Sequence, residues 1–91
     1  MVNTIWKYEL SVLCKNELMI PQGGKILSLQ MQCEEPCIWV QVDPDATLEL
    51  RVFRIVGTGQ KWSVPVRDTY IGTVQQGVFV WHCFEEESTI W

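Results

Sequence analysis

"KILSLQMQCEEPCIWVQVD", residues 25–43, holds the pattern that decides the fold. Its first half places apolar side chains at every second position: Leu27, Leu29, Met31 and Cys33. Strict alternation of this kind is typical of a strand with one buried face. The turn "EEP" (34–36) then leads into the β-rich run "CIWVQVD" (37–43), so the stretch predicts an antiparallel hairpin.

Similar short runs recur along the chain between turn-forming residues. They are TIWKYEL (4–10), ELMI (17–20), LELRVFRIV (48–56), TYIGTV (69–74) and VFVWHCF (78–84). KWSVPVRD (61–68) contains Pro65, which restricts it to an edge or a loop. ELSVLCKNELM (9–19) has roughly helical spacing but no convincing cap. We predict one all-β domain over residues 1–91, a small antiparallel barrel or sandwich of about six or seven short strands, with 85–91 as a flexible or docking tail.

Composition places the chain among globular proteins. It has 91 residues, 47% hydrophobic and 20% charged, with a net charge of −4. The negative charge disfavours binding to duplex nucleic acid. No apolar run approaches the length of a membrane span, and the first residues lack the features of a secretory signal, which favours a cytoplasmic location and no membrane contact.

The cysteines are interpreted as free thiols, because nothing in the chain indicates export. Cys33 and Cys37 have a spacing compatible with a zinc knuckle, but the second pair of ligands is missing. Two strand ends flanking a short turn give the same spacing, and this interpretation is preferred. We predict no metal and no cofactor.

His82, the single histidine, lies in the run "GVFVWHCFEEE" (77–87). Adjacent residues of a strand point to opposite faces, so the imidazole is expected to face away from Cys83. A thiol nucleophile needs an imidazole within hydrogen-bond reach. The carboxylates of 85–87 are interpreted as solvated tail residues. We therefore predict no catalytic residue and no enzymatic activity.

"GTGQK" (57–61) contains two glycines but lacks the third glycine and the strand-to-helix context of a dinucleotide fingerprint. A plain turn is the preferred interpretation, and an anion-binding turn is the alternative. Arg51, Arg54 and Lys61 are close in sequence and could form a local basic patch. The candidate ligand-binding residues are Arg54, Gly57, Thr58, Gly59, Gln60, Lys61 and Trp62.

Several predicted strands carry large apolar side chains on both faces. Trp39 opposes Val40, and Trp81 opposes Val80. Either a partner or a second copy of the chain covers this second face, or the stems of arginine and lysine do. The candidate interface residues are Trp39, Phe79, Trp81 and Trp91, and we expect a homo-oligomer.

The chain resembles a small uncharacterised family met in bacteriophage and prophage genomes. The resemblance covers nearly the whole chain through TIWKYEL, MIPQGGKILSLQMQ, CIWVQVDP, FRIVGTGQ, YIGTV and GVFVWHCFE. It implies a phage-encoded accessory protein that acts inside a bacterial host cell on a host protein. No catalytic residue carries over from this family.

Three functions are consistent with these features. The preferred one is a binding protein that inhibits or sequesters a host component, such as a CRISPR effector or another defence protein. The second is a small-molecule protein that binds a nucleotide or another small anion at the turn Gly57–Lys61. The third is a component of the virion or of its assembly.

Overall fold

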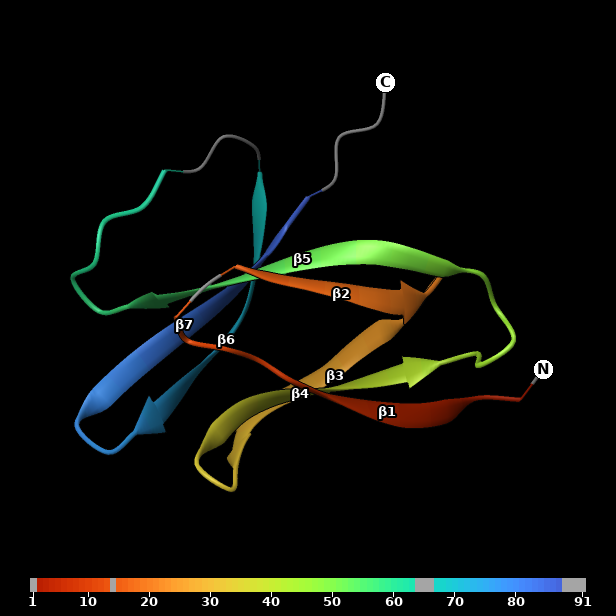
Figure 1. Cartoon of the computed structure of the whole chain (residues 1–91), viewed down its shortest axis with the longest axis horizontal. Coiled ribbons are helices and arrows are strands. Elements are labelled where there is room, and N and C mark those ends of the chain that lie inside the picture. The colour runs from red at the N-terminus through yellow and green to blue at the C-terminus, as the bar shows by residue number, and fades with distance from the viewer. Residues whose placement is uncertain (1, 14, 64–66, 88–91) are drawn as a thin grey trace.

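The computed structural model describes residues 2–13, 15–63 and 67–87, and within them it contains seven strands and no helix (Figure 1). The strands are β1 (Thr4–Glu9), β2 (Asn16–Pro21), β3 (Lys25–Gln32), β4 (Glu35–Val42), β5 (Leu48–Gly57), β6 (Asp68–Gln76) and β7 (Phe79–Glu86). They form a three-stranded sheet, β1-β4-β3, and a four-stranded sheet, β2-β5-β7-β6, in which every pair is antiparallel. The all-β prediction is confirmed, and the arrangement corresponds to a sandwich rather than a closed barrel.

The inner faces of both sheets supply the core. β4 contributes Ile38, Val40 and Val42, all nearly inaccessible to solvent. β5 and β7 contribute Phe53 and Cys83 from the facing sheet. Ile38, Val40 and Val42 occupy alternate positions of β4 because alternate side chains of a strand share one face.

The first hairpin has a different turn from the one expected. Its turn residues are Cys33 and Glu34, with φ of 51° and 67°, so "EEP" is not the turn. A two-residue turn with positive φ matches the twist of the flanking strands. As a result Pro36 lies inside β4 and is buried, and Cys33 is exposed at the turn instead of packing on a strand face.

The expected alternation of β3 also breaks at one position. The pairing with β4 shifts between Ile26 and Ser28, which leaves Leu27 as a bulge residue with an exposed fraction of 42%. The extra residue lets Ile26, before the bulge, and Leu29, after it, both lie on the core side. Ile26 therefore replaces Leu27 on the core side, opposite Val40.

A bidentate ion pair joins β5 to β7 on the inner face of the four-stranded sheet. Arg51 Nε and Nη2 donate to the two carboxylate oxygens of Glu85, at 2.6 and 2.8 Å. Arg51 Nη1 also donates to the carbonyl of Gly24, at 2.5 Å, so the same side chain ties the sheet to the turn after β2. These hydrogen bonds to Glu85 raise the pKa of Arg51. Both side chains are mostly buried.

The acidic segment 85–87 is therefore not a tail, contrary to the prediction. Glu85 and Glu86 belong to β7 and pair with Arg51 and Arg54 respectively, and Glu87 pairs with Arg67. These partners lie 20 to 34 residues away in the sequence, so inspection of the local composition did not reveal them. The remainder of the predicted tail, 88–91, lies outside the described residues.

The described residues do not meet the requirements for a membrane-spanning helix. None of their segments forms a helix long and apolar enough to span a bilayer.

We predict that Arg51→Met destabilises the fold, because it leaves the Glu85 carboxylate and the Gly24 carbonyl without their donors. The expected loss is about 3 kcal/mol in the free energy of unfolding, at the lower end for a buried pair because some solvent reaches it. The double variant Arg51→Met/Glu85→Gln should recover part of this loss. Urea unfolding followed by tryptophan fluorescence measures both values.

Arg67→Met is the matched control, because the Arg67 and Glu87 side chains keep exposed fractions of 86% and 50%. It should leave the urea midpoint unchanged. Equal midpoints for Arg51→Met and the wild type would contradict the structural role of the buried pair.

Candidate functional site

The outer face of the four-stranded sheet carries the candidate site. His82 and Phe84 lie on this face, whereas Cys83 between them points into the core with an exposed fraction of 1%. The prediction that the imidazole and this thiol face opposite sides is confirmed. The two groups therefore cannot act together as a nucleophile and its base.

Three aromatic rings gather on this face around Phe84, and we call Trp62, Tyr70 and Phe84 the aromatic cluster. The ring centroid of Phe84 lies 5.3 Å from that of Trp62 and 5.6 Å from that of Tyr70. Trp62 and Tyr70 keep exposed fractions of 38% and 57%. The alternation of β7 indicated the face of Phe84, but only the pairing of β6 with β7 brings Tyr70 opposite it.

Arg54 holds Trp62 over the sheet. Its Nη1 donates to the carbonyl of Ser63 at 3.0 Å, and its Nη2 pairs with Glu86 on β7. The segment that follows β5 is thus tied back to the face it has just left. Arg54 was predicted as a ligand-binding residue; its contacts with Ser63 and Glu86 also position the aromatic cluster.

A chain of hydroxyl groups holds His82 beside the aromatic cluster. Thr58 Oγ1 lies 2.8 Å from Nε2 of His82, and Thr73 Oγ1 lies 3.0 Å from Nδ1. The hydroxyl of Tyr70 shares a short hydrogen bond with Thr73 Oγ1. Hydroxyl groups both donate and accept, so they satisfy the imidazole in either tautomer. This arrangement fixes the ring in place on the surface.

The turn Gly57–Lys61, for which anion binding was the alternative interpretation, uses most of its amides in hydrogen bonds within the protein. The N–H of Gly57 donates to Gln60 Oε1 at 2.9 Å, and the N–H of Gln60 donates to the Gly57 carbonyl at 3.0 Å. The N–H of Thr58 donates to the carbonyl of Val80 at 3.2 Å. Gly59 has a φ of 84°, which explains the glycine at this position. A ligand here would meet side chains rather than a row of free amides.

Gly57 lies close to an indole ring. A Cβ atom added at this position would lie 3.2 Å from Cζ3 of Trp81, the residue paired with it on β7. Because Gly57 has no side chain, the indole of Trp81 can lie against its backbone.

A pocket of about 300 Å³ lies beside the turn, and we call it the basic pocket. Three of the predicted ligand-binding residues line it: Arg54, Gln60 and Trp62. Lys15 lines it as well, from the connection between β1 and β2. The sequence did not connect this residue with the site.

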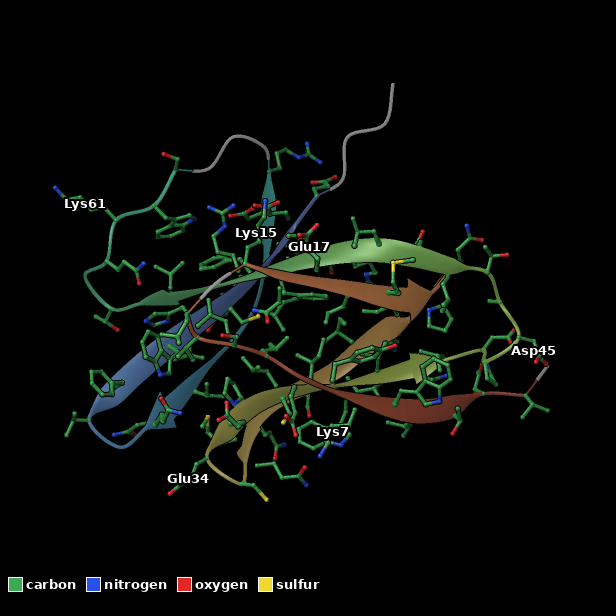
Figure 2. All side chains as sticks on the ribbon, in the orientation of Figure 1. Lys7, Lys15, Glu17, Glu34, Asp45 and Lys61 are labelled. Carbon is green, nitrogen blue, oxygen red and sulfur yellow. The ribbon has the colours of Figure 1, made fainter. Side chains whose placement is uncertain are left out.

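Lys61 does not line the basic pocket and extends away from the body of the protein (Figure 2). Arg51 faces the core side of β5, so the predicted basic patch is not formed.

Asn16 holds this connection in position. Its Oδ1 accepts from the N–H of Ser11 at 2.8 Å, and its Nδ2 donates to the carbonyl of Ser11 at 3.0 Å. The loop that brings Lys15 beside Arg54 is therefore fixed by a buried side chain. No short-range pattern in the sequence indicates this approach, because it depends on how the chain crosses between the sheets.

The predicted interface residues do not form one surface. Trp39 is half-buried on the three-stranded sheet, whereas Phe79 and Trp81 stack in the other sheet with ring centroids 5.7 Å apart. Trp91 lies outside the described residues.

The described thiols differ in their environments. Burial, and then the charge of Glu85, raises the pKa of Cys83 to about 12. Burial also raises the pKa of Cys37, whose Sγ donates to the carbonyl of Glu35 at 3.6 Å. Cys33 is exposed. Across the described residues, no three or more histidine, cysteine or acidic side chains form a metal-binding group.

We predict that the protein loses stability at alkaline pH because of Cys83. The thiol ionises near its ordinary pKa of 9.0 when unfolded and near 12 when folded. Between these values the folded state holds more protons, so the free energy of unfolding falls by about 1.4 kcal/mol per pH unit. Urea unfolding between pH 9 and 11 should show this slope, and Cys83→Ala should flatten it.

Cys33→Ala is the control, because this thiol is exposed in the folded protein. It should keep the wild-type slope. The prediction is wrong if Cys83→Ala and the wild type lose stability equally as the pH rises.

Comparison with known proteins identifies the family of this chain but assigns it no function. No curated protein and no solved structure matches the chain. Residues 1–90 match a family model described as a domain of unknown function, DUF7352. The expected membership of an uncharacterised family is therefore confirmed. The chain belongs to the DUF7352 family.

Proposed function

We propose that this protein is a non-enzymatic binding protein that holds a partner protein on its aromatic cluster. The observation that carries the proposal is the contact of Phe84 with both Trp62 and Tyr70 on an outer sheet face. Trp62 and Tyr70 remain substantially exposed despite these contacts.

Aromatic side chains in this setting suit recognition. They offer large contact areas and lose little conformational entropy, and tryptophan and tyrosine are enriched at the energetic centres of interfaces. Phe84 and Tyr70 stand on paired strands, and Arg54 restrains Trp62, so the surface is largely preorganised. The chain from Thr58 through His82 to Thr73 adds hydrogen-bonding groups at its border.

The resemblance to phage-encoded proteins suggests the class of partner. A small accessory protein produced in a bacterial host cell would act in the cytoplasm on a host protein. Occupying a functional surface of that protein would inhibit or sequester it. A defence protein, such as a CRISPR effector, is the partner that this setting favours.

The basic pocket favours a second candidate function, the binding of a small anion such as a nucleotide. Lys15 brings a cationic side chain to it, beside the guanidinium of Arg54 that pairs with Glu86, and Trp62 supplies an aromatic wall. Its volume of about 300 Å³ is at the lower end for ligand pockets. Among the described residues Lys15 has no carboxylate partner, so its charge is available to a phosphate group.

Immobilised protein should capture a specific protein from a bacterial lysate, and Trp62→Ala should reduce its retention at least tenfold. Trp6→Ala is the matched control, because Trp6 has an exposed fraction of 36% against 38% for Trp62 and lies on β1 of the three-stranded sheet. Quantitative mass spectrometry of the eluates compares the three baits, after circular dichroism confirms that they are folded. Equal capture by Trp62→Ala, or none by the wild type, would contradict the proposal.

For the second candidate, thermal denaturation should detect nucleotide binding. A ligand at ten times its Kd adds about 1.4 kcal/mol, which raises the Tm by several degrees in a domain of this size. Lys15→Met should abolish the shift and Lys61→Met should preserve it, because only Lys15 lines the basic pocket. An unchanged Tm with the wild type, or the same shift with Lys15→Met, excludes this function.

A further inference from the structure

A second cleft opens between the tips of the β3–β4 and β6–β7 hairpins, which lie side by side in Figure 1. Its volume is about 790 Å³. Met31, Val78 and Phe79 give it an apolar lining. Glu34 and Glu35 add two carboxylates at the tip of the first hairpin, where Glu34 points outward (Figure 2). We call it the hairpin cleft.

One amide side chain holds the two walls of the hairpin cleft together. Gln76 Nε2 donates to the carbonyl of Glu34 at 2.7 Å, across the gap between the sheets. Gln76 Oε1 accepts from Nε1 of Trp81 at 3.0 Å. Trp81 in turn stacks on Phe79. The spacing of the hairpin tips is therefore set by specific contacts.

The apolar lining is unusually open to water. Val78 has an exposed fraction of 89% in a turn, where polar residues are the norm, and Phe79, the first residue of β7, has one of 58%. Apolar groups gathered at a concave surface mark a binding site more often than isolated exposed ones do.

The lining of the hairpin cleft is negatively charged, which favours a cationic ligand. Its residues include two glutamates and no lysine or arginine. Within the described residues neither carboxylate takes part in an ion pair. A cationic side chain that reached Glu34 or Glu35 would be attracted there, while an adjacent apolar side chain would contact Phe79.

The strands beside the hairpin cleft favour an extended occupant. β3 is an edge strand of the three-stranded sheet, and β6 is an edge strand of the four-stranded sheet. Edge strands leave backbone donors and acceptors outside the ladder, and extended peptides bind by pairing with them.

We propose that the hairpin cleft binds an extended peptide segment in which a lysine or arginine lies next to a large apolar residue. This site is separate from the aromatic cluster, and it adds a second recognition surface to the protein. Glu34 and Glu35 attract the cation, and Met31, Val78 and Phe79 contact the apolar side chain.

Fluorescence anisotropy with the labelled hexapeptide KLKLKL tests the proposal, with ELELEL as the reversed-charge control. The wild type should bind KLKLKL at least tenfold more tightly than ELELEL in 100 mM salt. Glu34→Gln/Glu35→Gln and, separately, Phe79→Ala should each weaken binding of KLKLKL at least tenfold. Circular dichroism checks that both variants are folded, and the double glutamine variant changes only exposed side chains.

Glu17→Gln/Glu49→Gln is the matched control, because it removes two exposed carboxylates on β2 and β5, away from the hairpin cleft. It should retain wild-type affinity. An equal loss in this control would mean that KLKLKL responds only to the net charge, and it would overturn the proposal. Trp62→Ala should also retain affinity, so the result is independent of the aromatic cluster.

Cys33 provides a direct readout, because it lines the hairpin cleft and is exposed. Saturating KLKLKL should slow its alkylation by iodoacetamide several-fold, measured by mass spectrometry. Unchanged alkylation at saturation would contradict binding in the hairpin cleft. Light scattering tests whether the occupant is instead a second copy of the chain. If the wild type is a dimer and Phe79→Ala is a monomer, the peptide proposal is wrong.

Discussion

The register of β5 against β7 is the constraint on which the rest of the structure depends. Glu85 and Glu86 are neighbours on β7, so they point to opposite faces of the sheet. Arg51 pairs with Glu85 on the inner face, and Arg54 pairs with Glu86 on the outer face. A slip of one residue would exchange the faces of all β7 side chains and break both ion pairs. The two arginines therefore specify one pairing of these strands.

This constraint allows the four-stranded sheet to carry apolar side chains on both faces. Alternation of hydrophobicity alone would specify the register weakly here, because β7 presents Trp81 and Cys83 inward and Val80 and Phe84 outward. Charged pairs contribute specificity in such a case, even when their net contribution to stability is modest. The outer face can therefore carry a surface aromatic cluster. In a sheet whose register depended on hydrophobic alternation, these positions would hold polar residues.

Local patterns predicted the strands and the opposite orientations of His82 and Cys83, because alternation is a property of the strand itself. They failed where the structure depends on long-range contacts or on a single inserted residue. The bulge at Leu27 puts Ile26 on the core side in its place, while Leu29 keeps the expected face, and the composition of the strand does not reveal this. The partners of Glu85, and the approach of Lys15 to Arg54, are determined by the packing of distant segments. The hairpin cleft was missed for the same reason, although Phe79 at its wall had been singled out.

β7 also connects the two surfaces that we assign to binding. Phe79 is its first residue and contributes to the hairpin cleft, whereas Phe84 stands five positions later in the aromatic cluster. Five residues of extended chain span about 17 Å, beyond the distance at which substitutions usually interact. Losses at one surface should therefore leave the other intact, while the shared strand keeps their separation constant. A partner that contacts both would gain from this fixed spacing, because occupation of one surface raises the effective concentration at the other.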